Sequence, residues 1–490
     1  MNTSVSHVIA IDQGTTNTKA ILVDGSGKVI AKASAPLKSS YPKPGWAEQS
    51  ADDIWASVQQ AIAEIRAASA VEINGLAIAN QRETLVVWDS QTGQPIAPAI
   101  LWQCRRTAKV CADLIESGAD PMVTAATGLS INALFPASKL AWVMEHVPEA
   151  KTLSAAGRLR AGTVDAWLLY KLTDGREFAT DHSNASRTQL FNTGNLAWDE
   201  SLCRFFGVPQ SALPMPRPSD SPFGHTADGT TALGPDIPIL AMMGDSHAAL
   251  YGHGVRKPGL VKATYGTGSS LMTLTSQRIM SNHGLSSTIA WSDRHGTAYA
   301  LEGNITVSAQ AAAFAATMLG LADAQALSDL AQTVDDSAGV TFVPALAGLG
   351  APHWNDNATG TISGMTLATQ PAHVARATFE AIALQIADVF SAMEKDMGSA
   401  LAGLLADGGA SANSFLMQLQ SDILDRPVSR GDQAEVGAMG VARMALQSLG
   451  IGAETGGHAG TQNFIPGQLA GAERDRITRR WAEAVARVTS

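Results

Sequence analysis

Three short polar segments, far apart in the chain, combine the residue types that contact phosphate groups. They are residues 11–16 (Ile-Asp-Gln-Gly-Thr-Thr), 244–247 (Gly-Asp-Ser-His) with 265–268 (Tyr-Gly-Thr-Gly) behind them, and 406–410 (Ala-Asp-Gly-Gly-Ala). Glycine lets backbone N–H groups approach an oxyanion closely, and threonine hydroxyls add further donors. A carboxylate beside such a turn can hold hydrated Mg²⁺, which is the role expected of Asp12. Taken together, the three segments indicate a site for ATP.

The elements around the first segment exclude the common nucleotide loops. Apolar runs at 8–11 and 20–24 flank it, so it joins two strands, whereas dinucleotide loops and P-loops lead into a helix. The chain also contains no G-x-x-x-x-G-K-[ST] sequence. The same pattern of strand, Gly/Thr tip and strand recurs at 259–274, which suggests a duplicated domain with nucleotide held between the copies. An ordinary polar hairpin turn is the alternative for either tip.

The third segment has a different setting. Leu404 to Ala406 is expected to end a strand, and Asn413 to Leu424 is expected to form a helix. Residues 407–410 would then form a strand-to-helix turn, which suits backbone contact with a ribose or a phosphate. A purely structural Gly-Gly turn explains the same pattern.

A second set of residues could bind a small hydroxylated molecule. Arg82 and Glu83 follow the predicted strand 75–79, and Trp102 ends another short strand. Charged groups can bind adjacent hydroxyls bidentately, and an indole offers a flat wall for a carbon chain and one N–H donor. A surface ion pair and a core tryptophan are the simpler reading of these residues.

Length and composition favour a large soluble enzyme. A chain of 490 residues is too long for one core, and we expect a boundary near Gly252, giving domains 1–252 and 253–490. The net charge of −10 argues against a nucleic-acid partner. No uninterrupted apolar stretch is long enough to span a bilayer, and no basic segment followed by an apolar core stands at the N-terminus, so neither a membrane anchor nor a signal peptide is expected. Three scattered cysteines suit the cytoplasm. The proline-rich stretch 213–222 is expected to be a surface connection. The oligomeric state stays open, with a homodimer among the candidates.

Several longer strings resemble one enzyme family. Residues 80–107, NQRETLVVWDSQTGQPIAPAILWQCRRT, are similar to glycerol kinases, as are TVDAWLLYKLT, TDHSNASRTQLFN, TYGTG, GLGAP and FLMQLQSDIL, in the same order. The resemblance runs from about Val8 to at least Gly452, and it identifies the chain as a member of the FGGY carbohydrate kinases. It implies an α/β fold of two ribonuclease-H-like domains, of the actin and hexokinase type. It also implies an interdomain cleft that closes on an acceptor and MgATP.

The resemblance also implies roles for individual residues. Asp245 would be the general base that takes the proton from the attacking hydroxyl. Asp12 would be linked to the metal ion. The acceptor contacts would be Arg82, Glu83 and Trp102, the phosphate-side groups Thr15, Thr16, Thr267 and Gly268, and the adenosine-side groups Gly409 and Asn413.

The departures from glycerol kinases gather on the acceptor side. Where those enzymes have Tyr, Gln and Phe, this chain has Leu134, Ser246 and Ser270, so side-chain bulk is lost at all three positions. We therefore expect ATP-dependent phosphorylation of a four- or five-carbon polyol or ketose, with a pentulose such as xylulose among the candidates. A glycerol kinase proper is the alternative. An actin-like ATPase or a non-catalytic sugar sensor is a remoter one, because neither explains both the Arg82, Glu83 and Trp102 stretch and Asp245.

Overall fold

The computed structural model describes residues 6–431, 435–451 and 461–489. Gly452, to which the family resemblance extends at least, lies outside these ranges. The chain forms two compact units. The first comprises the described parts of 1–254, 287–299 and 435–456, and the second those of 255–286, 300–434 and 457–490. The first unit is therefore completed by a segment from near the end of the sequence.

The sheet of the first unit begins with the predicted hairpin, β1 (His7–Gln13) and β2 (Asn17–Asp24), in which Ile11 pairs with Ala20. Strands β5 (Gly75–Asn80) and β13 (Ile239–Gly244) run parallel to β1, and β3 (Val29–Pro36) pairs with β2. The order is β13-β5-β1-β2-β3. Because Asn80 pairs with both Gln13 and Gly244, three strands end at the same edge of the sheet.

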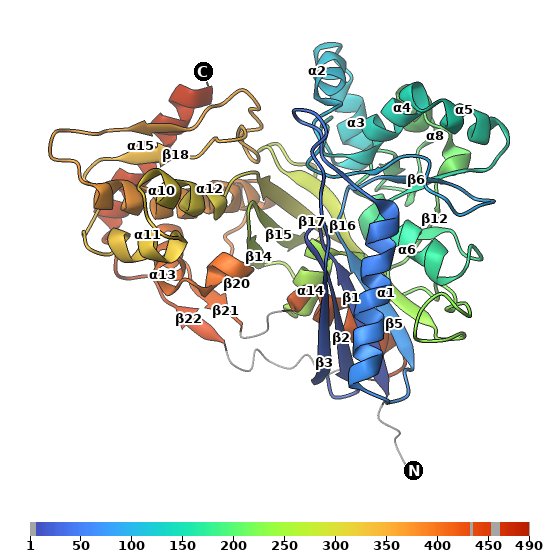
Figure 1. Cartoon of the computed structure of the whole chain (residues 1–490). Helices are drawn as coiled ribbons and strands as arrows, with labels where there is room; N and C mark the ends of the chain where they lie inside the picture. Colours follow the sequence, from blue (N-terminus) through green and yellow to red (C-terminus); the bar gives the residue numbers. More distant parts are fainter. Residues whose placement is uncertain (1–5, 432–434, 452–460, 490) are drawn as a thin grey trace. The chain divides into compact units, whose positions relative to one another are not determined.

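Helix α1 (Ala51–Ala68) packs along β2 and β3 (Figure 1). It is capped by Ser50, whose side chain accepts from the Asp53 N–H. The other elements of this unit are β4 (Glu48–Gln49), β6 (Val86–Asp89), β7 (Ala99–Ile100), α2 (Ala108–Glu116), α3 (Asp120–Thr127), α4 (Pro136–His146), α5 (Pro148–Ala155), β8 (Leu159–Gly162), α6 (Val164–Leu172), β9 (Ala179–Asp181), α7 (His182–Ala185), β10 (Phe191–Asn192), β11 (Ala197–Trp198), α8 (Glu200–Phe206), η1 (Gln210–Ala212), β12 (Met215–Arg217), α9 (Asp245–Gly252) and α14 (Val436–Ser448).

The proline-rich stretch 213–222 is more than the surface connection expected from its composition. Strand β12 within it pairs with β9 in parallel, and Ser219 just after it is fully buried. Proline is tolerated here because Pro216 lies on a short strand of a two-stranded sheet.

The sheet of the second unit repeats the strand arrangement of the first. Strands β14 (Leu260–Tyr265) and β15 (Ser269–Thr275) form an antiparallel hairpin, and β20 (Gly403–Asp407) and β21 (Val428–Arg430) continue the sheet in parallel beyond β14. The duplication predicted from the sequence is therefore confirmed at the level of strand order. Strands β16 (Ser286–Asp293) and β17 (Gly296–Ile305) are divided between the units, because residues 287–299 group with the first unit. The other elements of the second unit are α10 (Gln310–Met318), α11 (Ala324–Ala331), β18 (Thr341–Val343), β19 (Thr361–Ser363), α12 (Pro371–Met397), η2 (Gly409–Ala412), α13 (Ser414–Leu424), β22 (Gln462–Phe464) and α15 (Gly471–Thr489).

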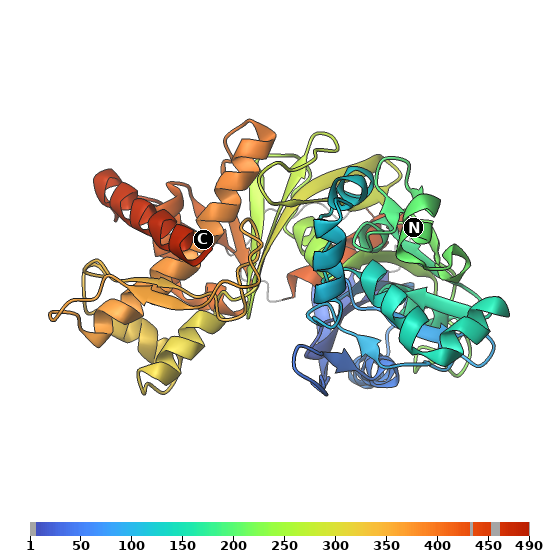
Figure 2. The same cartoon turned by 90° about the horizontal axis from the view of Figure 1, so that it is seen from above.

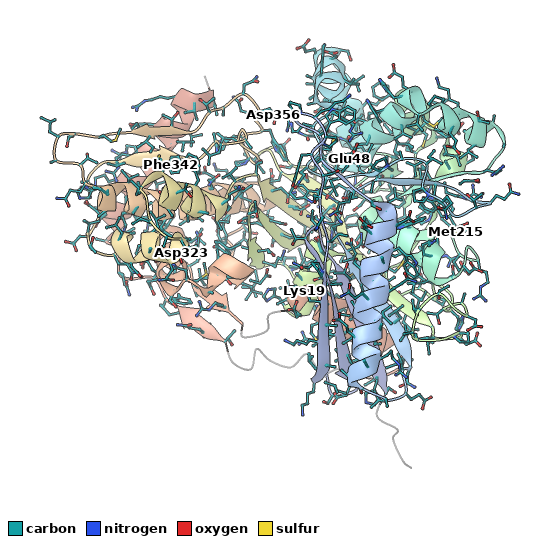
Figure 3. All side chains as sticks on the ribbon, in the orientation of Figure 1. Lys19, Glu48, Met215, Asp323, Phe342 and Asp356 are labelled. Carbon is teal, nitrogen blue, oxygen red and sulfur yellow. The ribbon has the colours of Figure 1, made fainter. Side chains whose placement is uncertain are left out.

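Helix α12 is the central helix of the second unit. Its apolar face, represented by Ile382, Ile386 and Val389, is buried in the core. Helices α11, α13 and α15 all pack against it, and the red helix of Figure 2 is α15. Phe342 on β18, labelled in Figure 3, belongs to the same core.

Two glycines allow α9 and α14 to pack with their backbones in close contact. A Cβ on Gly440 would lie 1.9 Å from the carbonyl oxygen of Ala248, and one on Gly252 would lie 2.2 Å from that of Val436. No side chain fits at either position without separating the helices. The N-terminus of α14 is thereby fixed against α9 and the sheet.

Gly440→Ala should lower the stability of the protein by about 3 kcal/mol, the upper part of the range for overpacking, because the clash is with backbone that cannot rotate away. Differential scanning calorimetry would show a lower Tm. Gly471→Ala is the matched control, since its Cβ would meet only Arg474 Nη2 at 3.8 Å and should change stability by less than about 0.5 kcal/mol. An unchanged Tm for Gly440→Ala would contradict the packing described.

Asp165, in the first turn of α6, is fully buried. Its carboxyl accepts from the Thr163 and Thr180 hydroxyls at 2.5 and 2.6 Å and from the Asp181 N–H at 3.2 Å. Burial, with a smaller contribution from the nearby Asp181 charge, raises the pKa of Asp165 from 3.8 to about 6. Between these two pH values the folded protein therefore binds a proton that the unfolded chain releases.

The stability that this proton contributes is fully present below about pH 4 and is lost as the pH rises through 6. The side chain of Asp165→Asn cannot titrate, so the Tm of this variant, relative to that of the unmodified protein, should rise as the pH increases from 4.5 to 7. The change corresponds to roughly 3 kcal/mol of stability at most. The comparison is of melting curves across this range. Asp228→Asn removes an exposed carboxyl and is the control for the loss of one acidic side chain. Melting curves of Asp165→Asn that run parallel to those of the unmodified protein would refute the assignment.

Candidate active site

Asp245 lies where β13 ends and α9 begins, at the edge of the sheet where β1 and β5 also end. The Nε of Arg82 donates to its Oδ1 at 3.1 Å, and the N–H of Ser246 donates to the same oxygen at 2.6 Å. A cationic donor and a backbone N–H in the first turn of a helix both stabilise an ionised carboxylate. The side chain of Asp245 is 41% exposed, whereas that of Arg82 is 8% exposed. Asp245 is thus a fixed carboxylate that remains open to a ligand.

Gly244 makes the contact between Arg82 and Asp245 possible. A Cβ at this position would lie 2.7 Å from both Cγ and Cδ of Arg82 and 2.9 Å from Nδ1 of His247. Any side chain here would therefore push Arg82 away from the carboxylate. The glycine is required by close approach, because its φ of −60° is open to every residue.

Glu83 has a backbone conformation that is rare outside glycine. Its φ is +58°, and a buried glutamate persists there only when its surroundings hold it. Arg187, fully buried, donates from Nε to Glu83 Oε1 at 2.7 Å, and its guanidinium lies 5.1 Å from the ring centroid of Phe135. Arg82 Nη1 is 3.9 Å from the same Glu83 oxygen. The charges therefore alternate in sign from Asp245 through Arg82 and Glu83 to Arg187.

Buried amide side chains join the β1–β2 tip to the loop that follows β5. Gln81 Nε2 donates to the side-chain oxygens of Gln13 and Gln49 at 3.2 and 3.1 Å. Gln81 Oε1 accepts from the Thr15 hydroxyl at 3.3 Å, and that hydroxyl accepts from Trp102 Nε1 at 3.0 Å. The Thr15 hydroxyl and the indole N–H are thus both used within the fold. Among the predicted phosphate-side groups of this tip, Thr16 is the exposed one.

Asp12 lies near the end of β1, beside the start of α14. A Cβ on Gly437 would be 2.9 Å from Asp12 Oδ2 and 3.5 Å from the carbonyl oxygen of Asp245. The carboxylate therefore faces the first turn of a helix, where unpaired N–H groups and the helix dipole favour negative charge. On the same side, Lys19, labelled in Figure 3, pairs with Glu435 at 3.0 Å.

Asp181 supports this edge of the sheet from behind. Its carboxylate accepts from the N–H groups of Ser183 and Asn184, from both of their side chains and from the Ser219 hydroxyl, at 2.7–3.0 Å. Ser183 Oγ accepts from the Gly244 N–H at 3.0 Å, and Asn184 exchanges two amide hydrogen bonds with Asn80. The buried Asp181 therefore fixes the residues just before both Asp245 and Arg82.

Leu134 and Ser246 also lie in the first unit. Leu134 is half-buried next to the Arg187 partner Phe135, and Ser246 is buried in the first turn of α9. Ser270 lies in the second unit, on β15, where its hydroxyl donates to Glu302 Oε1 at 3.0 Å. Within the first unit, the structure gathers Asp12, Thr15, Arg82, Glu83, Trp102 and Asp245 through the contacts above.

The second unit carries the remaining nucleotide candidates. Thr267 is exposed at the β14–β15 tip, and Gly268 is packed so tightly that a Cβ would lie 2.4 Å from the Ile305 carbonyl oxygen. Gly408 has φ +86°, and a Cβ there would lie 2.5 Å from the Tyr265 carbonyl oxygen. Gly409 faces open space. The turn therefore needs glycine at 408 for its conformation, and leaves 409 accessible to a ligand.

Asn413, predicted on the adenosine side, uses both the oxygen and the nitrogen of its side-chain amide for hydrogen bonds within the second unit. Its Oδ1 caps α13 by accepting from the Leu416 N–H at 2.9 Å, and its Nδ2 donates to Ser328 Oγ at 2.8 Å. A nucleotide would add to these contacts. The segment 409–412 between β20 and α13 is a short 3-10 helix, η2.

Sequence reasoning missed the residues that hold the site residues in place. Gln81, Asp181, Arg187 and Gly437 act through other residues, and no pattern of spacing pointed to them. The quoted strings contained the first three, so the signal was polar residues inside otherwise apolar segments. Within the described ranges, no group of three or more His, Cys, Asp or Glu side chains is arranged to hold a metal ion.

Comparisons with known proteins agree with this architecture. The N-terminal domain of the FGGY family of carbohydrate kinases matches residues 7–252, and its C-terminal domain matches 261–449. An apulose kinase of Pectobacterium atrosepticum is 47% identical over 90% of each chain, and a glycerol kinase of Symbiobacterium thermophilum is 44% identical over 98% of each. No helix among the described residues is long and apolar enough to cross a membrane.

Solved structures show the same fold. The crystal structure of Plasmodium falciparum glycerol kinase with ADP superimposes with a TM-score of 0.92 at 30% identity, covering 99% of this chain and 98% of the other. A ligand-bound xylulose kinase of Lactobacillus acidophilus gives 0.91 at 22% identity, with 99% of each chain covered, which concerns the fold alone. With both of its domains matched, the chain belongs to the FGGY family of carbohydrate kinases.

Proposed function

We propose that this protein transfers the γ-phosphoryl group of ATP to a hydroxyl of a small polyol or ketose, with Asp245 as the general base. The observation that carries the proposal is the ion pair of Asp245 with Arg82. It holds an accessible carboxylate at an edge of the sheet, and Arg82 also lies 3.9 Å from the carboxylate of Glu83. A base in reach of the acceptor oxygen, together with alignment and charge neutralisation, is what phosphoryl transfer requires.

On the acceptor side, we assign Arg82 and Glu83 to hydroxyl recognition and the face of Trp102 to the carbon chain. The indole N–H is held by Thr15, so Trp102 contributes its ring and not a donor. Glu83 is oriented by Arg187, which leaves it as a fixed acceptor for substrate hydroxyls. Arg82 bridges the two carboxylates, and so links acceptor binding to the base.

On the nucleotide side, we assign phosphate contacts to Thr16, Thr267 and the backbone around Gly268, with the Thr15 backbone in support. Gly409 and Asn413 would lie toward the adenosine. Asp12 suits Mg²⁺, because this ion is commonly bound by one or two carboxylates together with substrate phosphates. Bound there, Mg²⁺ would neutralise triphosphate charge. The position of Asp12 against α14 keeps its carboxylate oriented.

The acceptor that fits best is a four- or five-carbon polyol or ketose. Leu134, Ser246 and Ser270 are smaller than the Tyr, Gln and Phe expected in glycerol kinases, so a longer acceptor would find room. The glycerol kinase relatives keep glycerol as the second candidate. An ADP-release assay with glycerol, tetritols, pentitols, xylulose and apulose would test both. ADP release without any acceptor would indicate an ATPase, and none with any acceptor would indicate a sensor.

Asp245→Asn should lower kcat by roughly 10²–10⁴, the span of a positioned general base, while the KM for MgATP changes little. The amide can still accept a hydrogen bond from Arg82, so the geometry of the site is retained. Steady-state kinetics with the preferred acceptor would measure this. Asp228→Asn provides the control for a lost surface carboxylate, and near-normal turnover of Asp245→Asn would remove Asp245 from the mechanism.

The pocket hypothesis predicts a preference for the longer acceptor over glycerol of tenfold or more in kcat/KM, because one methylene in a pocket is worth about 1–3 kcal/mol. Leu134→Tyr with Ser270→Phe should move that ratio toward glycerol by penalising the longer acceptor. Each single variant shows whether its position contributes. If the unmodified enzyme already prefers glycerol to every longer acceptor, the hypothesis is wrong and the chain is a divergent glycerol kinase.

A further inference from the structure

Lys139 is the fully buried lysine of α4, and its contacts are with main-chain oxygens. Its Nζ donates to the carbonyl oxygens of Leu134 at 2.7 Å, Glu83 at 3.0 Å and Trp102 at 3.5 Å. These three carbonyls belong to three separate loops of the first unit. Each of the three residues is assigned to the acceptor pocket, and one amine therefore ties its walls together.

The placement is costly for a lysine. Within the described part of the chain, Lys139 has no carboxylate within 4.0 Å, and burial lowers its pKa from 10.5 to about 7, against a smaller opposing effect of Glu83. A buried amine that only filled space could be replaced by an apolar side chain at little cost. Three converging carbonyls instead match the three donors of an ammonium group, and each would lose this donor without it.

Other contacts do not replace this connection. The Arg187 contact orients the Glu83 carboxylate, and the Thr84 hydroxyl accepts from the Trp102 N–H at 3.3 Å. Leu134 is otherwise held by Asn132 of its own loop, whose side chain accepts from the Leu134 N–H. Lys139 thus links the main chain of the Leu134 loop to the main chains of Glu83 and Trp102, whereas Arg187 joins Glu83 to the neighbouring Phe135 through side chains.

We infer that Lys139 is a positioning residue that sets the width of the acceptor pocket and so determines which acceptors are recognised. The inference rests on the proposed function, because it takes residues 83, 102 and 134 as pocket walls. Lys139 does not touch the acceptor. It holds the main chains from which the acceptor-binding side chains project, and a displacement of about 1 Å at such side chains is enough to weaken catalysis strongly.

The test compares Lys139→Met with Lys262→Met. Lys262, on β14, is also fully buried, so the control makes the same chemical change at the same burial but in the other unit from residues 83, 102 and 134. Lys139→Met should raise the KM for the preferred acceptor tenfold or more and narrow the discrimination between that acceptor and glycerol. Its KM for MgATP should stay within twofold, and Lys262→Met should leave the acceptor KM within twofold.

Two outcomes would overturn the inference in kinetics: an acceptor KM within twofold of normal for Lys139→Met, or an equal rise for Lys262→Met. If Lys139→Met does not fold, Lys139→Gln, which keeps two N–H donors, is measured in the same way. Failure of both to fold would also overturn it, since Lys139 would then serve the fold and not acceptor recognition. An unmodified protein that is silent with every acceptor would instead refute the proposed function.

Discussion

The ion pair between Arg82 and Asp245 is the interaction on which the candidate site depends. It joins a loop after β5 to the first residue of α9, and it exists because Gly244 leaves room for the Arg82 side chain. The parallel pairing of β5 with β1 and β13 brings the ends of all three strands to one edge. The hydrogen bonds of the Asp181 carboxylate, and those among the side chains of Gln13, Gln49 and Gln81, hold these strand ends in register.

Much of this was predictable from the sequence, for physical reasons. Apolar runs around Gly/Thr tips predict the two hairpins. Ser50 and Asn413 are typical cap residues, and both stand at the observed starts of helices. The duplicated strand order follows from recognising the second hairpin. The short strand β12 was missed, because its proline-rich sequence is typical of loops and its pairing with β9 depends on tertiary contacts.

The supporting residues of the site were not predictable in the same way. Lys139, Asp181 and Arg187 are charged residues in buried positions, and their partners lie between 2 and 104 residues away in sequence. Spacing rules describe one face of one element, whereas these contacts arise where several loops meet. The use of the Thr15 hydroxyl by Trp102 and Gln81 likewise became visible only in three dimensions.

Helix α14 comes late in the sequence but belongs to the first unit, and this has a consequence for biosynthesis. Asp12 is synthesised more than 400 residues before the helix that faces its carboxylate. The β1–β2 hairpin can therefore form early, but the environment of Asp12 cannot be completed until most of the second unit has also been synthesised. The order in which the chain is made thus delays an assembled first unit, and with it the complete surroundings of Asp12, until α14 has been synthesised.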